Sequence, residues 1–600
     1  MVVKTLRSIV LILSLSPASS VPSSLAPSSR GEAAAQEFLD LYSSLLIGIS
    51  TVSSEASWRA STDVKPEHDG ERVGAGKAFS RFIGDRGVIE KARALLKDGG
   101  ELSPLTVRQL QKLLLASAEA PGTIPDVVNA RVEAESRQAS LQDGFEFRIG
   151  GKKVTANDID NVLGRSKDLA ERLEAWRASK EIGKVLRPGL IELQRLRNRV
   201  AREMGHSSFH ALQVADYDMS VREMGELLDG FIRDTRPLYE HLHTWTKHEL
   251  AKRYGSPVPA RAIPAHWINN RWSQNWTGIV EAASLDAFFE KREPAWIVRQ
   301  AEAFYVSMGF ERLPESFWTK SDLFPIPASE TRKKNSHASA WHVDLGADVR
   351  SLMSVEPNER WFATSHHELG HIYYYISYTR PEVPPILRGG ANRAFHEGIG
   401  ELISIASRQT PYLRQVGILP EGKEIDRIQF LLDEALGETV PFLAWSSGVM
   451  ARWEADLYEG NLSPAEYNSR WWSYVRKYQG IEPPEPRGEE WCDPATKTHI
   501  NDDAAQYYDY AIATVLKYQL HDHIARKILK ADPQSANYYG RRDVGDFLRS
   551  ILSQGATRPW REVLREATGE DLSTRALVEY FRPLQAWLEK ENAGRKVGWE

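Results

Sequence analysis

The chain has 600 residues and balances 76 basic against 81 acidic side chains, for a formal net charge of −5. This slightly acidic balance indicates no basic surface of the kind that binds nucleic acid, so we expect no nucleic-acid partner. Hydrophobic residues make up 42% of the chain and 18 residues are tryptophan, which is ample material for a large core. The single cysteine, Cys492, excludes an intramolecular disulfide and lies in no Cys/His nucleophile signature.

The first residues resemble a secretory signal. Lys4 and Arg7 precede an apolar run at 9–13, and small residues follow it. This run is far shorter than the roughly 20 apolar residues that span a bilayer, so we expect cleavage and no membrane anchor. Residues 1–30 are therefore predicted to be a signal peptide and a disordered, Ser/Pro-rich leader of an exported protein, periplasmic or extracellular. Residues 31–600 show no linker-like composition and are predicted to form a single helical domain with two lobes.

Helical periodicity dominates the remaining chain. Apolar residues recur at helical spacing in segments 34–46, 88–96, 105–118, 169–182, 361–378, 394–401 and 507–527. Alternating strand patterns are scarce. Residues 145–154 predict a short hairpin turning at Gly150 and Gly151, and residues 337–343 predict a strand that is well placed to pair with a substrate. The predicted fold class is mainly α, a large body with a deep central cleft between two lobes and a few short strands.

The most informative motif lies in the predicted helix 361–378, where the sequence is His-Glu-Leu-Gly-His at residues 367–371. Residues four apart share one face of a helix, so His367 and His371 are directed at a single point that can hold zinc. Glu368 then lies where a carboxylate can take a proton from metal-bound water. An accidental match in a chain of this composition has a probability on the order of a few per cent. The motif therefore indicates a metal-dependent hydrolase.

A zinc site of this kind needs a third protein ligand and an open position for water. The best candidate is Glu397, on the helical segment 394–401 that follows a proline-rich turn. His396 and His366 are rivals, but each neighbours a proposed ligand and projects about 100° away from it, which favours packing or a hydrogen bond to a ligand. Glu401, one turn beyond Glu397, is either a partner of a ligating histidine or a solvated carboxylate.

These residues and further blocks of the sequence resemble the peptidyl-dipeptidase A family of angiotensin-converting-enzyme-like zinc metallopeptidases. Besides the zinc motif, the matching blocks are 270–276, 337–341, 390–392, 395–397, 471–472, 477–480, 497–499, 558–560 and 580–583. They cover nearly the whole chain beyond the leader. The resemblance implies a zincin-like helical fold and one zinc ion held by His367, His371 and Glu397. It also implies oligopeptide substrates with a free C-terminal carboxylate.

The resemblance also implies an anchor for the peptide's C-terminus. A glutamine, a lysine and a tyrosine bind the C-terminal carboxylate in the family, and they match Gln274, Lys497 and Tyr507. One cation and two neutral donors suit an anionic chain end. Relatives that release single residues carry arginine where Gln274 stands, so glutamine favours release of dipeptides. The loop from His499 to Tyr507 is one residue longer than in the family, which leaves Tyr508 as a rival of Tyr507.

Further roles are implied nearer the reacting bond. Two substrate-binding histidines of the family match His337 and His499. The tyrosine that donates to the tetrahedral intermediate matches Tyr510. Ala338 matches a position whose backbone pairs with the extended substrate. The implied catalytic residues are Glu368 as general base, His499 and Tyr510.

Departures from the family pattern concern mainly chloride. Asp509 stands where the family has an arginine that helps to bind an activating chloride ion, and Val475 replaces a second such arginine. An aspartate repels an anion, so the sequence argues against chloride as a cofactor. The spacing from His371 to Glu397 is longer than usual, which a turn can absorb. Glu401 stands where the family usually has aspartate.

The sequence therefore predicts a zinc-dependent peptidyl-dipeptidase, which hydrolyses oligopeptides and releases C-terminal dipeptides by attack of metal-activated water. Two alternatives remain open. One is a single-residue carboxypeptidase or endopeptidase on the same zinc centre, against which Gln274 argues. The other is a catalytically silent peptide-binding protein, against which the complete set of metal ligands and general base argues.

Overall fold

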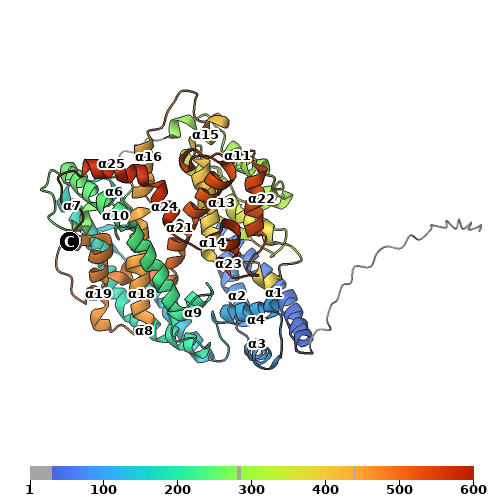
Figure 1. Ribbon diagram of the computed structural model, residues 1–600. Coiled ribbons are helices and arrows are strands. Elements are labelled where there is room, and N and C mark those ends of the chain that lie inside the picture. The colour runs from blue at the N-terminus through green and yellow to red at the C-terminus, as the bar shows by residue number, and fades with distance from the viewer. Residues whose placement is uncertain (1–29, 280–284, 438) are drawn as a thin grey trace, which may run out of the picture.

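The computed structural model describes residues 30–279, 285–437 and 439–600. Helices build most of the molecule (Figure 1), which confirms the predicted mainly α fold class with a few short strands. Apart from Arg30, the predicted signal peptide and leader lie outside the described residues. The single domain with two lobes over 31–600 remains a prediction. No helix in the described ranges combines the length and the apolar character needed to cross a bilayer.

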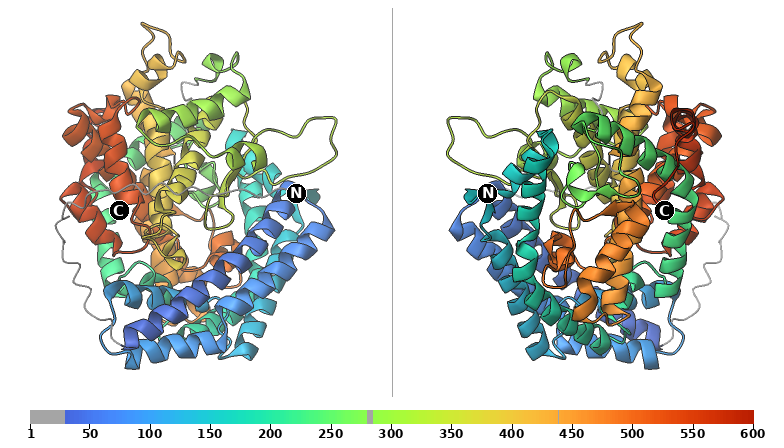
Figure 2. Two further views of the ribbon diagram at one scale, coloured as in Figure 1. Left: turned by 90° about the vertical axis from the view of Figure 1, so that its right-hand side faces the viewer. Right: turned by 90° about the vertical axis from the view of Figure 1, so that its left-hand side faces the viewer.

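The first four of the five N-terminal helices share an apolar core of their own. The five helices are α1 (Arg30–Thr62), α2 (Pro66–Ile83), α3 (Arg86–Asp98), α4 (Pro104–Ser117) and α5 (Pro125–Asp143). Leu39, Tyr42 and Leu113 belong to a cluster that α1 to α4 share, and Figure 2 shows these helices as a blue group at the lower edge. The Glu32 carboxylate accepts hydrogen bonds from the Ser103 backbone and the Thr106 hydroxyl, which ties α1 to the start of α4.

The middle of the chain contributes α6 (Ala156–Arg165), α7 (Leu169–Lys180), α8 (Ile182–Glu203), α9 (Phe209–Ala215), α10 (Val221–Tyr254), α11 (Pro294–Ser307) and α12 (Glu315–Lys320). The longest of these, α10, begins with a capping box in which the Ser220 and Glu223 side chains bind each other's backbone N–H groups. It ends at Gly255, whose φ of 59° is a left-handed conformation that glycine adopts without strain.

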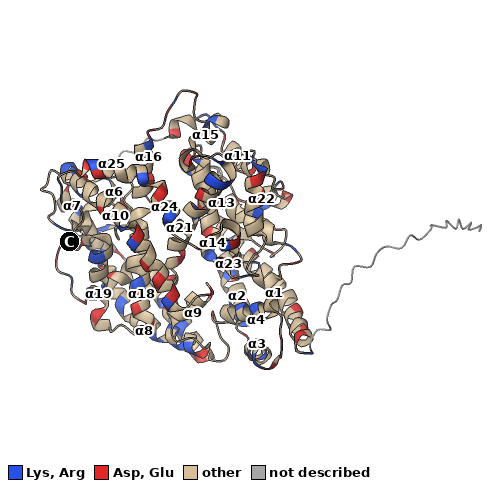
Figure 3. Ribbon diagram, viewed as in Figure 1, with Lys and Arg blue, Asp and Glu red and all other residues tan. Residues whose placement is uncertain are grey.

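The C-terminal part is also helical. Its helices are α13 (Glu359–Tyr378), α14 (Arg393–Ser407), α15 (Thr410–Gln415), α16 (Arg427–Leu436), α17 (Val440–Leu443), α18 (Ala451–Tyr458), α19 (Tyr467–Tyr474), α20 (Thr498–Asp502), α21 (Tyr508–His523), α22 (Arg542–Leu552), α23 (Trp560–Thr568), α24 (Arg575–Tyr580) and α25 (Arg582–Glu591). The predicted helix 507–527 is shorter as an α-helix, because a π-helical turn at Ile524–Leu529 follows α21. Basic and acidic residues are interspersed along these helices (Figure 3).

Three small sheets complete the fold of the described ranges. Strands β1 (Phe147–Ile149) and β2 (Lys152–Val154) form the predicted hairpin, with positive φ at Gly150 and Gly151. Strand β3 (Ile263–Pro264) pairs in parallel with β6 (Ile481–Glu482). Strand β4 (Ser339–His342) pairs antiparallel with β5 (Val349–Leu352). The strand predicted at 337–343 is therefore confirmed in its central four residues.

The main core brings α13, α14 and α21 together. Helix α14 packs against both α13 and α21, and the three helices lie near the centre of Figure 1. Fully buried tryptophans, among them Trp445 and Trp560, fill the surrounding core, and burial of an apolar side chain of that size contributes about 1.5–3 kcal/mol or more. Cys492 is buried as well, and burial raises the pKa of its thiol to about 12, so it packs as a protonated apolar side chain.

Candidate active site

Two glycines set how closely α13 approaches α14. A Cβ atom on Gly370 of α13 would lie 3.0 Å from Cα of Gly400 on α14. A Cβ atom on Gly400 would lie only 2.8 Å from two atoms of the His367 ring. The His367 imidazole therefore rests against the bare backbone of α14, a contact that any side chain at position 400 would obstruct. Side-chain caps start both helices, because Asn358 and Asn392 accept backbone N–H groups of their first turns.

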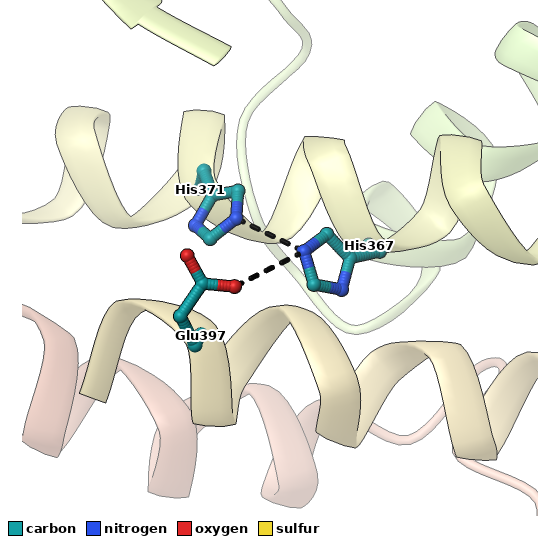
Figure 4. A group of neighbouring side chains, drawn as sticks. All are labelled: His367, His371 and Glu397. Atoms are coloured by element: carbon teal, nitrogen blue, oxygen red, sulfur yellow. Dashed lines mark hydrogen bonds and ion pairs between the residues drawn. The ribbon is translucent and has the colours of Figure 1, made fainter. Parts of the chain in front are cut away.

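His367, His371 and Glu397 converge between these helices (Figure 4). The Nε2 atoms of the two histidines are 3.1 Å apart, and Nε2 of His367 is 3.7 Å from Oε2 of Glu397. One ligand atom from each residue lies within 4.8 Å of the others, and within the described residues this is the only group of His, Cys, Asp or Glu side chains so arranged. A tetrahedral ion with bonds of 2.0–2.1 Å would hold its donors about 3.3 Å apart, so the three side chains fit zinc.

Glu401 lies on the outer side of His367. Its Oε1 atom is 3.6 Å from Nδ1 of His367, and its Oε2 atom is 3.1 Å from Nζ of Lys517. Burial alone would raise the pKa of Glu401, but Lys517 and His367 together hold it below its usual value. A carboxylate in this position orients the imidazole of His367, so the geometry favours the first of the two roles considered for Glu401.

The two rival histidines lie outside the metal-binding group. His396 approaches the far side of His371, with 3.3 Å between their Nδ1 atoms. His366 is fully buried, and its ring nitrogens contact the Phe362 carbonyl at 2.8 Å and the Tyr412 hydroxyl at 3.0 Å. His396 therefore adjoins a candidate ligand, whereas His366 packs in the core.

The Glu368 side chain is 6% exposed, and its Oε2 atom makes no hydrogen bond to any described residue. Burial raises the pKa of its carboxyl group to about 7, and the nearby Glu397 adds to the rise, while His367 opposes it. A bound cation would lower the pKa of Glu368. An unsatisfied buried carboxylate oxygen is costly unless it has a functional partner.

A cavity of about 840 Å³ opens beside this centre and brings several predicted site residues together. Its walls include His337, Ala338, His367, Glu368 and Glu401. His337 is exposed, and Ala338 directly precedes β4. Among the described residues β4 pairs only with β5, and Ala338, immediately before it, brings backbone groups to the cavity wall.

The three predicted carboxylate-binding residues form a second group. Nζ of Lys497 donates to Oε1 of Gln274 at 2.7 Å. The same ammonium lies 4.5 Å from the Trp272 ring centroid and 5.3 Å from that of Tyr507. Tyr508, the rival of Tyr507, instead packs edge-on against Tyr217 in the core, with 5.3 Å between ring centroids. Tyr507 is therefore the tyrosine that adjoins Lys497.

His499 and Tyr510 adjoin this second group. The Tyr510 hydroxyl is 3.5 Å from Nε2 of His499, and the Tyr507 ring centroid lies 5.0 Å from the His499 ring and 4.9 Å from the Tyr510 ring. Burial lowers the pKa of His499 to about 3, with Lys497 as a further cause, and burial raises the pKa of Tyr510 to about 12. Near neutral pH the imidazole is therefore uncharged and the phenol keeps its proton.

Comparison with known proteins identifies the family. The family model for peptidase M2, described as angiotensin-converting enzyme, matches residues 29–599. The chain belongs to this family. The angiotensin-converting enzyme-like protein Ace3 of Mus musculus is 32% identical over 463 residues, which is 74% of this chain and 62% of that protein. The angiotensin-converting enzymes of Mus musculus and Rattus norvegicus are each 30% identical, over 98% and 97% of this chain and 46% of each enzyme.

Membership of the M2 family confirms the resemblance that the sequence motifs indicated, and it places the chain in a family of metallopeptidases. The chain spans roughly half the length of the angiotensin-converting enzymes that it matches. The roles of individual residues in this M2 protein stay predictions.

The sequence did not reveal the contacts of Asp509. This side chain is 1% exposed, and its Oδ2 atom is 3.1 Å from Nε of Arg393 on α14. The sequence predicted a carboxylate that repels an anion, and the structure adds that an arginine from another helix lies against it. The only hint of this contact in the sequence was that Arg393 lies one helical turn before Glu397 on the same segment, and therefore near the predicted site.

Proposed function

We propose that this M2 family member is a zinc-dependent peptidyl-dipeptidase that removes dipeptides from the C-terminus of oligopeptides. The supporting observation is the convergence of His367, His371 and Glu397 beside the buried Glu368, at the edge of the large cavity. These three ligands would hold one zinc ion, which when bound supplies Lewis-acid activation of water and of the scissile carbonyl.

Glu368 acts as general base and then as general acid. Its Oε2 atom, without a partner among the described residues, accepts a proton from the attacking water, and the carboxyl group then delivers this proton to the departing amine. Burial raises the pKa of this carboxyl group and a bound cation would lower it, so the group can both accept and return a proton. This proton makes the amide nitrogen the neutral amino group of the departing dipeptide, and ionisation of the new carboxylic acid supplies the second proton that the amine carries near neutral pH.

Tyr510 and His499 stabilise the negative charge that develops on the carbonyl oxygen. Tyr510 keeps its proton because its pKa is raised to about 12, so it can donate a hydrogen bond at the moment when charge appears. His499 stays neutral in its partly buried setting and supplies a second polar contact. We assign His337 and the Ala338 backbone to binding of the extended peptide on the cavity side.

Lys497, Gln274 and Tyr507 determine the product length in this proposal. The Lys497 ammonium, 4% exposed and held beside Gln274, would bind the terminal carboxylate through a charge-assisted hydrogen bond. A fixed distance between this anchor and the metal-binding group selects the second peptide bond from the end. We further propose that the protein is exported and needs no chloride, because Asp509 lies against Arg393.

The proposal is tested with an N-terminally blocked tripeptide and its C-terminal amide. We expect the zinc-loaded protein to release the last two residues of the free acid as one dipeptide. A chelator should abolish this release and added zinc should restore it, whereas the amide should be a poor substrate. Single amino acids among the products, identified by mass spectrometry, would favour a carboxypeptidase. Absence of cleavage by zinc-loaded protein would contradict a peptidase function.

A further inference from the structure

The Arg393 side chain contacts the Tyr510 phenol and two carboxylates beside it. It is the first residue of α14, one turn before Glu397. Its Nη2 atom donates to the Tyr510 hydroxyl at 3.0 Å, and its Nη1 atom donates to both carboxylate oxygens of Asp503 at 2.8 and 3.0 Å. Its Nε atom lies 3.1 Å from Oδ2 of Asp509. One guanidinium therefore joins the helix that carries Glu397 to the start of α21.

The proton count at the phenol fixes the direction of its hydrogen bond. A guanidinium has donors and no acceptor, whereas a phenol has one proton and accepting lone pairs. In the contact with Arg393 the Tyr510 oxygen must therefore accept. The single proton of Tyr510 is then left for a partner elsewhere, and the neighbour in the described structure is Nε2 of His499 at 3.5 Å.

We propose that Arg393 is a positioning residue of the peptidase reaction, which holds the Tyr510 phenol as an acceptor and so directs its proton toward the reacting carbonyl. This inference rests on the proposed function of Tyr510 as a donor to the oxyanion. A hydrogen bond from a cation also polarises the phenol, which strengthens the bond that its proton donates.

The arginine is held firmly enough for this role. Asp509 is buried, and its Oδ1 atom accepts the Tyr510 backbone N–H at 2.7 Å, so the carboxylate is fixed on α21. Asp503 binds the guanidinium from the preceding loop. Burial alone would lower the pKa of Arg393, but Asp509 and Asp503 raise it above its usual value, so the cation persists. A planar guanidinium group that is bound at several points has little rotational freedom.

A double-mutant cycle with Arg393→Gln and Tyr510→Phe tests the proposal. We expect Arg393→Gln to lower kcat by about 10- to 100-fold, with KM changed less than about two-fold, because the contact acts on the transition state. Tyr510→Phe should lower kcat by about 100-fold or more, the scale of a lost oxyanion donor. In the Tyr510→Phe background, Arg393→Gln should cost no further activity, since its target hydroxyl is absent.

The matched control is Arg380→Gln, which removes an exposed arginine paired with Glu382 and should leave both constants unchanged. Arg393→Lys should fall between the parent and Arg393→Gln, because an ammonium can reach the phenol or a carboxylate but lacks the planar fork. Zinc content and Tm are measured for every variant. If Arg393→Gln lowered kcat equally in the parent and in the Tyr510→Phe variant, or changed KM alone, the proposal would be overturned.

A second measurement does not depend on peptidase activity. In protein labelled with ¹³C at the tyrosine Cζ atoms, the resonance missing from Tyr510→Phe identifies Tyr510, and its shift reports hydrogen bonding at the phenol. We expect Arg393→Gln to move this resonance and Arg380→Gln to leave it in place. An unmoved resonance would refute the contact. Absence of hydrolysis by zinc-loaded parent protein would instead refute the proposed function, while the resonance still decides the contact.

Discussion

The metal-binding group and the carboxylate-binding group are built in different ways. His367, His371 and Glu397 come from two successive helices that touch through a pair of glycines. Gln274 and Lys497 come from segments separated by more than a third of the chain, and only the tertiary fold brings them to 2.7 Å. The first group is anionic and the second cationic. We therefore expect substitutions near the metal to act on turnover and substitutions at the anchor to act on substrate selection.

The largest expected effect is at Glu368. Glu368→Gln removes the proton acceptor while keeping the shape of the side chain, so kcat should fall by about 10²- to 10⁴-fold with zinc retained. The measurement is the steady-state rate on the blocked tripeptide, with metal content determined in parallel. The exposed residue Glu421 supplies the control, Glu421→Gln, which should match the parent. If the Glu368→Gln variant had the same kcat as the parent, the proposed mechanism would be contradicted.

At the anchor, Lys497→Met replaces a buried cation with a side chain of similar length. Loss of a charge-assisted hydrogen bond, about 1.5–3 kcal/mol, should lower kcat/KM for the free-acid tripeptide by about 10- to 100-fold. The amide should be affected much less, so the preference for the free acid should shrink. The exposed Lys423 supplies the control, Lys423→Met. If Lys497→Met kept the full preference, the carboxylate would be bound elsewhere.

The contact between the two helices is tested at Gly400. Gly400→Ala would place a methyl group 2.8 Å from the His367 ring, so the imidazole must shift and zinc affinity should fall by about 10- to 100-fold. Gly389→Ala is the control, because a Cβ atom there meets nothing within 4 Å. Competition with a chromogenic chelator measures the affinity. An unchanged affinity in Gly400→Ala would show that the close approach does not hold the ligand.

The smallest expected effect is that of chloride. Because Asp509 lies against Arg393, exchange of chloride for acetate at constant ionic strength should change the hydrolysis rate by less than about two-fold, the scale of non-specific salt effects. Initial rates over a range of chloride concentrations provide the measurement. Saturable activation by several fold would show that an anion binds despite this carboxylate.

Much of the fold followed from periodicity, and the exceptions have physical reasons. The segments predicted at 361–378 and 394–401 are α13 and the first half of α14, and the hairpin at 145–154 turns at its two glycines. The π-helical turn after α21 was missed. A π-helical turn contains one more residue than an α-helical turn, and its position depends on how the helix packs. The 3.6-residue periodicity of apolar residues does not indicate that position.

By itself the sequence determined the direction of His367 and His371, because residues four apart on a helix must share a face. It also named the carboxylate, Glu397, that the fold places beside them. Only the tertiary structure decided that Lys497 meets Gln274, that Tyr507 and not Tyr508 lies beside Lys497, and that Arg393 contacts Tyr510. Such contacts join segments that are far apart in the chain. Their distance in space is set by packing of the core and cannot be read from the sequence.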